Sequence, residues 1–145
     1  MAGHIFLYGT MLPQLARGCS ARLAASLGEG RAATVRGLLY AVVSPLGSFP
    51  VLFGAGEGMV AGEVYEIPRV AGWLEELDRY ENCDPANEAA SDYLRREVAA
   101  TLADGSVIAA QAYIGRGSAA GDLLPIRHGD FARFLAETGL RPYEA

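Results

Sequence analysis

One acidic side chain, Glu81, falls on the apolar side of an amphipathic helix. The segment 68–80 is the clearest helix candidate, with a proline near its start, where proline is favoured. At about 100° per residue its apolar positions form one stripe: Val70, Trp73, Leu74, Leu77 and Tyr80. On the same wheel Glu81 lies within about 40° of three stripe residues, whereas four other charged residues lie off the stripe: Glu75, Glu76, Asp78 and Arg79. Among the acids of this stretch, Glu81 alone points toward the expected core.

A buried carboxyl group at the end of a helix has an unusual acidity. Desolvation disfavours its ionised form, and the negative end of the helix dipole does so again, so both raise its pKa. Such a group can accept and donate a proton near neutral pH. The same spacing fits a helix that ends at Tyr80, with Glu81 facing the solvent of the following loop.

The loop Tyr8-Gly9-Thr10-Met11-Leu12 is a second candidate. It follows an apolar segment at 4–8 that is rich in aromatic and β-branched residues, which predicts a strand running into a loop. Consecutive backbone N–H groups in such a loop can form a nest that binds a carboxylate. An ordinary turn at the end of a strand explains the same residues, and the sequence leaves both interpretations open.

The other reactive residue types form no catalytic or metal-binding motif. The glycines of 54–58 are spaced as in a phosphate loop, but a strand-like segment follows where a phosphate loop requires a helix. The sequence has neither G-x-S-x-G nor H-E-x-x-H, and His4, His128, Cys19 and Cys83 show no metal-ligand spacing. We therefore expect no metal and no cofactor.

The composition predicts one globular domain over residues 1–145 and argues against several partners. The chain has 145 residues, 51% of them hydrophobic, which suits a single folded core. Its net charge is −5, its 12 basic residues are all arginine, and none form a basic block, so nucleic-acid binding is not expected. The apolar runs are too short to cross a bilayer, and the N-terminal residues lack the basic region of a signal peptide. We expect no membrane partner and a cytoplasmic location; the sequence does not predict the oligomeric state.

Hydrophobic patterning predicts many strands and few helices. Strand-like segments lie at 4–8, 31–43 with a bend at Gly37, 49–53, 59–67, 93–102 and 106–115. Two hairpins are predicted, 49–53 with 59–67 across the glycine-rich loop, and 93–102 with 106–115 across Asp104-Gly105. Helices are predicted at 20–27, 68–80 and 129–138, the last stopped by Gly139, and the polar segment 82–92 is a predicted loop. The short links between strands favour an α+β fold with a mostly antiparallel sheet or small barrel.

Four segments, in order along nearly the whole chain, are similar to the motifs of the γ-glutamylcyclotransferase-like family. Phe6-Leu-Tyr-Gly-Thr-Met-Leu-Pro13 resembles the opening Y-G-[ST]-L loop of the family, and Gly62-Glu-Val-Tyr-Glu-Ile67 resembles its G-E-L-Y-E-V strand. Leu77-Asp-Arg-Tyr-Glu81 followed by Tyr93-Leu-Arg95 resembles L-D-x-x-E-G and Y-x-R, and Ile126-Arg-His-Gly-Asp-Phe131 resembles the closing G-D-[WF]. Asn82 replaces the glycine after the family's glutamate, and asparagine tolerates the left-handed conformation that such a turn requires.

The resemblance implies a small mixed β-barrel with flanking helices, and it implies roles for particular residues. Glu81 becomes the catalytic carboxylate, and the loop Tyr8–Leu12 holds the substrate through the N–H groups of Gly9, Thr10 and Met11. Tyr113 matches a tyrosine near the pocket, although a core tyrosine is an equal alternative. Arg95 would orient Glu81 or the substrate, or else pair with Glu97 on the same strand; Glu63 would be an auxiliary carboxyl.

The implied reaction converts a γ-glutamyl amine or amino acid to 5-oxoproline and a free amine. The substrate carries its own nucleophile, the α-amino group, so intramolecular attack has a large effective molarity. Glu81 would take the first proton and return it to the leaving amine. Two alternatives remain at this stage: a non-catalytic member of the fold that binds a small carboxylate or a partner, and an amide hydrolase in which Glu81 activates water.

Overall fold

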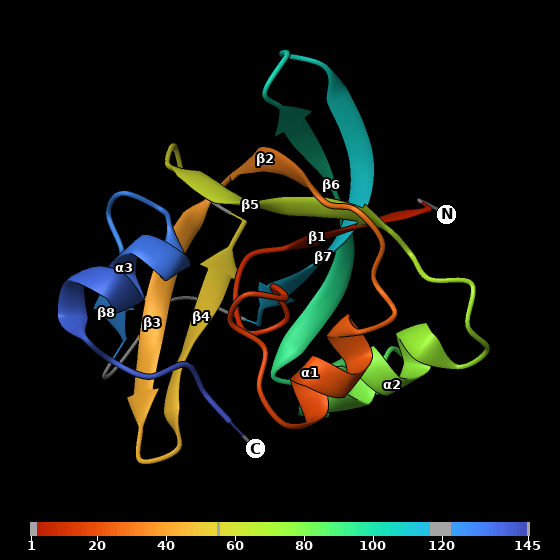
Figure 1. The fold of residues 1–145 in the computed structure, drawn as a ribbon, viewed down its shortest axis with the longest axis horizontal. Helices are drawn as coiled ribbons and strands as arrows, with labels where there is room; N and C mark the ends of the chain where they lie inside the picture. Colours follow the sequence, from red (N-terminus) through yellow and green to blue (C-terminus); the bar gives the residue numbers. More distant parts are fainter. Residues whose placement is uncertain (1–2, 55, 117–122, 145) are drawn as a thin grey trace.

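The computed structural model describes residues 3–54, 56–116 and 123–144. Its strands, shown in Figure 1, are β1 (His4–Leu7), β2 (Arg31–Arg36), β3 (Leu38–Ser44), β4 (Gly47–Phe53), β5 (Met59–Glu66), β6 (Tyr93–Leu102), β7 (Val107–Gly115) and β8 (Leu124–Pro125). Its helices are α1 (Cys19–Ala24), α2 (Trp73–Tyr80), the 3-10 turn η1 (Glu88–Ala90) and α3 (Phe131–Thr138). None of the helices in these ranges is long and apolar enough to cross a membrane.

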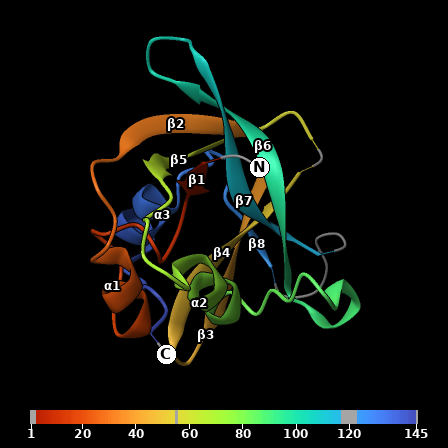
Figure 2. The same cartoon turned by 90° about the vertical axis from the view of Figure 1, so that its right-hand side faces the viewer.

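Five strands close into a barrel, and three others form a second sheet beside it. The barrel order is β1-β5-β2-β6-β7, in which β1 and β7 are parallel and the other pairs antiparallel. The second sheet has the order β4-β3-β8. Helices α1 and α2 lie side by side at one end of the barrel (Figure 2). The predicted α+β fold with a small mixed barrel and flanking helices is confirmed.

The bend predicted at Gly37 is the point where the chain leaves the barrel for the second sheet. Strand β2 ends at Arg36 in the barrel, and β3 begins at Leu38 in the second sheet. A Cβ atom on Gly37 would lie 2.7 Å from the carbonyl oxygen of Phe53, so the backbones approach too closely here for a larger residue. One glycine thus separates the two sheets.

The predicted hairpin of 49–53 with 59–67 is wrong. Strand β4 pairs instead with β3, from Leu38 opposite Phe53 to Ser44 opposite Gly47, whereas β5 lies inside the barrel between β1 and β2. A tight turn at 44–47, closed by the Ser44 hydroxyl donating to the Gly47 carbonyl at 2.9 Å, provides the shorter connection for β4. Residues 54 and 56–58 of the glycine-rich loop connect the two sheets, and Ala55 lies outside the described residues.

The hairpin across Asp104-Gly105 is confirmed, with Thr101 opposite Val107 and Gly105 in a left-handed conformation. Helix α3 ends as predicted at Gly139, and the Asp130 carboxylate caps its start by accepting from the Arg133 N–H. Helix α2 is shorter than predicted. It begins at Trp73 after a left-handed Gly72, and Val70 is 55% exposed and no part of the buried stripe. The sequence did not predict β8 or η1.

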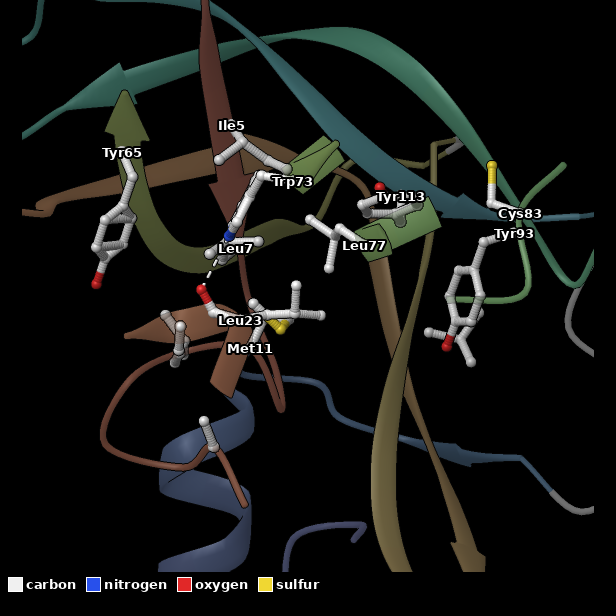
Figure 3. Close-up of a cluster of buried hydrophobic side chains, with 14 of the residues drawn as sticks. Ile5, Leu7, Met11, Leu23, Tyr65, Trp73, Leu77, Cys83, Tyr93 and Tyr113 are labelled. Atoms are coloured by element: carbon white, nitrogen blue, oxygen red, sulfur yellow. Dashed lines mark hydrogen bonds between the residues drawn. The ribbon is translucent and has the colours of Figure 1, made fainter. Parts of the chain in front are cut away.

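Helix α2 is anchored by a cluster of buried hydrophobic side chains at one end of the barrel. Trp73 and Leu77 pack among Ile5, Leu7 and Met11 (Figure 3). The Trp73 indole N–H donates to the carbonyl of Leu23 at 2.9 Å, which satisfies its buried polar group and joins α2 to the end of α1. The C-terminal turn of α2 is therefore held at a fixed position relative to the first strand.

Candidate active site

The end of helix α2 places Glu81 at the edge of the core. The Glu81 N–H donates to the Leu77 carbonyl at 2.9 Å, so the residue completes the last helical turn. Asn82 follows in a left-handed conformation with φ 52°, its N–H donates to Arg79, and the Cys83 N–H donates to the Asp78 carbonyl. These bonds are those of a Schellman motif, which reverses the chain directly after Glu81. The expectation that Asn82 supports the turn in place of glycine is confirmed.

Glu81 faces a cavity of about 220 Å³ together with the loop that follows β1. The cavity is lined by Phe6, Leu7, Tyr8, Gly9, Thr10, Met11, Phe49, Pro50, Tyr80, Glu81, Asn82, Asp92, Tyr93, Tyr113 and Tyr143. Its walls come from β1, the end of α2, β4, the start of β6, β7 and the C-terminal segment. The structure thus brings together two sequence candidates that lie some seventy positions apart in the chain.

The carboxyl group of Glu81 is strongly desolvated, although the residue as a whole is only half-buried because one side of it borders the cavity. Burial, with a smaller contribution from the negative charge of Asp78, raises its pKa from 4.5 to about 8. No hydrogen bond between the described residues involves this carboxyl group. Glu81 is therefore a proton acceptor and donor near neutral pH whose oxygens are unpaired in the described part of the chain.

Four tyrosines surround Glu81, and three of their hydroxyl groups donate elsewhere. Tyr8 donates to the carbonyl of Tyr113, Tyr93 to the carbonyl of Pro50 at 2.8 Å, and Tyr113 to Asp78 at 2.6 Å. The Tyr80 hydroxyl shares a hydrogen bond of 3.1 Å with the hydroxyl of Thr10. Burial is the main cause that raises the pKa of Tyr8, Tyr80, Tyr93 and Tyr113; the charge of Glu81 adds to it in all four, and Asp78 adds more than Glu81 does for Tyr113. All four hydroxyl groups therefore stay neutral.

The loop after β1 also lines the cavity and presents backbone N–H groups. The Leu12 N–H donates to the Gly9 carbonyl at 2.9 Å and closes a turn. Within the described residues, the N–H groups of Gly9, Thr10 and Met11 have no protein acceptor. Because these residues are buried and line the cavity, the unpaired donors can serve a bound carboxylate. Leu12 does not line the cavity. Its side chain is buried in the hydrophobic core and anchors the turn there.

Glycine is required at position 9 by its neighbour on β4. A Cβ atom there would lie 2.3 Å from Cγ of Pro50, well inside contact distance. The loop can therefore lie flat against the second sheet only without a side chain at this position.

Asp78 is the main correction to the sequence analysis, which placed it off the buried stripe. It is 6% exposed, and its carboxylate accepts from Nε of Arg95 at 2.9 Å and from the other arm of the guanidinium at 3.1 Å. The Tyr113 hydroxyl completes the cluster, and Arg95 also reaches Gln111 at 3.4 Å. Arg95 consequently pairs with neither Glu81 nor Glu97, and it does not line the cavity. An arginine on a half-buried strand was the signal that a buried acid must accompany it.

Glu63 also lies away from this site, because its carboxylate accepts from the Tyr65 hydroxyl at 2.8 Å and does not line the cavity. Tyr113 belongs to both environments: its ring lines the cavity and its hydroxyl binds Asp78. The cavity also contains residues that were not predicted as site residues from the sequence, among them Tyr80, Tyr93, Pro50, Asp92 and Tyr143. Tyr80 was detectable from its place beside Glu81 on the stripe; the others depend on tertiary packing. The described residues contain no cluster of His, Cys, Asp and Glu suited to a metal ion.

Beside a small closed barrel, the cavity thus combines an acid that has no hydrogen-bond partner among the described residues with a loop whose N–H groups have none there either. The model of the family described as gamma-glutamyl cyclotransferase, AIG2-like, matches residues 5–133. The chain therefore belongs to this family. No curated protein sequence matches it.

Solved structures with the same fold share little sequence with this chain. The protein At5g39720.1 of Arabidopsis thaliana is 22% identical with a TM-score of 0.64, and the match covers 94% of this chain and 83% of that one. An AIG2-like protein of Mus musculus is 24% identical with a TM-score of 0.58, covering 81% and 80%. YkqA of Bacillus subtilis is 20% identical with a TM-score of 0.66; the match covers 96% of this chain and 43% of YkqA. At these identities the similarity concerns the fold.

Proposed function

We propose that the protein is a γ-glutamylcyclotransferase that converts a γ-glutamyl amine or γ-glutamyl amino acid to 5-oxoproline and the free amine. The observation that carries the proposal is the unpaired Glu81 carboxyl group, with a pKa of about 8, in the same cavity as the free N–H groups of 9–11. This arrangement matches the needs of the reaction, namely an anchor for a carboxylate and a group that exchanges protons near neutral pH.

Binding orients the two ends of the glutamyl moiety. The N–H groups of Gly9, Thr10 and Met11 receive the α-carboxylate, and the α-ammonium group then lies toward Glu81. A positive charge beside Glu81 favours its ionised form and so lowers its pKa in the complex. The acid that is mostly neutral in the free protein thus becomes the base that the reaction needs.

Proton transfer and ring closure follow. Glu81 takes one proton from the α-ammonium group, and the resulting amine attacks the γ-carbonyl carbon to form a five-membered ring. Protonated Glu81 gives its proton to the leaving nitrogen, and the bond between that nitrogen and the γ-carbon breaks. The regenerated carboxylate accepts the surplus proton of the ring nitrogen, and that proton leaves with the amine. The products are 5-oxoproline and the amine.

The test is a panel of γ-glutamyl amines and γ-glutamyl amino acids, with 5-oxoproline measured by mass spectrometry. We expect wild-type turnover that Glu81→Gln abolishes while substrate binding, measured by calorimetry, survives. Glu75→Gln, on an exposed position of the same helix, is the matched control and should behave as wild type. Binding without product from any member of the panel would instead indicate a non-catalytic carboxylate-binding protein, and release of free glutamate would indicate a hydrolase.

A further inference from the structure

The segment 141–144 lies outside the residues that the family model matches, yet it contributes to the cavity. The C-terminal segment lies beside the second sheet (Figure 1). Pro142 forms a parallel bridge with Ser48 of β4. Three backbone hydrogen bonds hold it: Ser48 N–H to the Arg141 carbonyl at 2.8 Å, Tyr143 N–H to the Ser48 carbonyl at 2.7 Å, and Glu144 N–H to the Leu46 carbonyl at 3.0 Å. The segment is thus added to the edge of the second sheet as a short extra strand.

The sequence of β4 is adapted to this contact. A Cβ atom on Gly47 would lie 2.5 Å from the Pro142 carbonyl oxygen and 2.8 Å from Cα of Tyr143. Any side chain at Gly47 would therefore push the segment away. Phe49, two residues further along β4, packs edge-on against the Tyr143 ring, with centroids 5.3 Å apart and planes at 75°.

Tyr143 and Phe49 together form an aromatic wall of the cavity, beside Pro50. The same cavity is also lined by the groups that the glutamyl moiety needs, the N–H groups of 9–11 and the Glu81 carboxyl. Within the described residues the Tyr143 hydroxyl has no hydrogen-bond partner, so this polar tip and the part of the ring that lines the cavity are open to a ligand. The aromatic wall is therefore available to the leaving-amine portion of the substrate.

We propose that Tyr143 is a specificity-determining residue that contacts the leaving-amine portion of the substrate, held in place by the pairing of segment 141–144 with β4. This inference rests on the proposed cyclotransferase function and assigns part of its substrate selectivity to a segment outside the family match. It selects for leaving amines long enough and apolar enough to reach an aromatic wall.

The experiment compares two substrates that differ only in the leaving amine, γ-glutamyl hexylamide and γ-glutamyl methylamide. Tyr143→Ala should lower the ratio of their kcat/KM values by about three- to tenfold, the range for losing one aromatic contact, chiefly through a higher KM for the hexylamide. Tyr143→Phe keeps the ring and should retain most of the selectivity. Arg141→Ala is the control from the same segment, because its side chain reaches the Pro45 carbonyl and not the cavity.

A second variant tests the docking of the segment independently. Gly47→Ala substitutes no cavity residue, but its methyl group would meet Pro142 and Cα of Tyr143, at a position whose φ of 116° also disfavours a side chain. It should therefore displace the segment together with Tyr143 and reproduce the lower ratio of Tyr143→Ala. Equal losses for hexylamide and methylamide in Tyr143→Ala, or an unchanged ratio, would overturn the inference. If the wild type forms no 5-oxoproline from these amides or from any other member of the γ-glutamyl panel, the proposed function fails. The inference then stands or falls on whether Tyr143→Ala lowers the ratio of their binding constants, measured by calorimetry in the Glu81→Gln background.

Discussion

Replacing Glu81 with glutamine should stabilise the protein, and should do so increasingly as the pH rises. In the folded chain burial holds the Glu81 pKa at about 8, whereas an unfolded chain ionises the same group near its ordinary value of 4.5. Between these two values the folded protein binds a proton that the unfolded chain has lost. Wild-type stability therefore falls as the pH rises through this window, because folding must keep the acid neutral or bury its charge. Glutamine carries no charge at any pH and avoids this loss.

The magnitude follows from the two pKa values. Each tenfold change in acidity corresponds to about 1.4 kcal/mol, so a shift from 4.5 to about 8 amounts to about 5 kcal/mol once the pH exceeds the upper value. At about pH 6 only the first part of the window has been crossed, and the expected difference is about 2 kcal/mol. Below about pH 4 the two proteins should differ only by a constant that does not depend on pH.

Urea unfolding of wild type and Glu81→Gln across the range from about pH 4 to about pH 9 measures this difference directly. Contributions from all other titrating groups cancel when the two proteins are subtracted at each pH. Glu75→Gln removes an exposed carboxyl from the same helix, and its difference from wild type should stay close to flat. A flat difference for Glu81→Gln as well would show that the carboxyl is solvated in the folded protein and would refute the assignment of a buried acid.

Three further outcomes are expected. The kcat/KM of the wild type should rise with pH around a midpoint near 8, because the free protein must lose the Glu81 proton before that group can act as a base; a profile independent of pH would contradict this. Asp78→Asn should move that midpoint to lower pH by removing a neighbouring negative charge, and should lower the free energy of unfolding by about 3 to 5 kcal/mol by leaving Arg95 without its partner. An unchanged midpoint would show that Asp78 does not influence Glu81. Gly9→Ala should raise KM and lower the melting temperature, since its methyl group meets Pro50, whereas Gly28→Ala, which meets nothing within 4 Å, should resemble the wild type. Enzyme assays measure the KM of the two variants, and thermal unfolding measures their melting temperatures.

Local features of the fold were predictable because their signals are local. The hairpin at 93–115 is encoded by Asp104-Gly105 and two alternating segments, and the bend at Gly37 by one glycine between apolar runs. The partner of β4 was not predictable in this way. A glycine-rich loop reports that the chain turns, but not in which sheet it continues, and the choice depended on a competing turn at 44–47 and on the closure of the barrel.

The site shows the same division. Helical spacing put Glu81 on the buried side of α2 but equally allowed a helix that ends at Tyr80, and the role of the residue came from the family resemblance. In the structure Glu81 completes the last turn of α2 and its carboxyl group is desolvated. Helical spacing predicted a solvent-facing Asp78, because it assumes that α2 buries only one face. In the structure Asp78 contacts Arg95 of β6 and Tyr113 of β7, so this side of α2 is buried as well, and Arg95 neutralises the acid. Tyr143 reaches the cavity only through pairing between distant segments, which periodicity does not register.

Because Gly37 leads the chain from the barrel into the second sheet, the residues that line the cavity come from two separately hydrogen-bonded sheets. The barrel and α2 supply Glu81 and the loop 9–11, while β4 and the segment paired with it supply Phe49, Pro50 and Tyr143. Under the proposed function, substitutions along that outer edge can therefore change which leaving amines are accepted while Glu81 and the loop 9–11 keep their geometry. A lineage of such proteins would be able to explore new substrates at little risk to the chemistry itself.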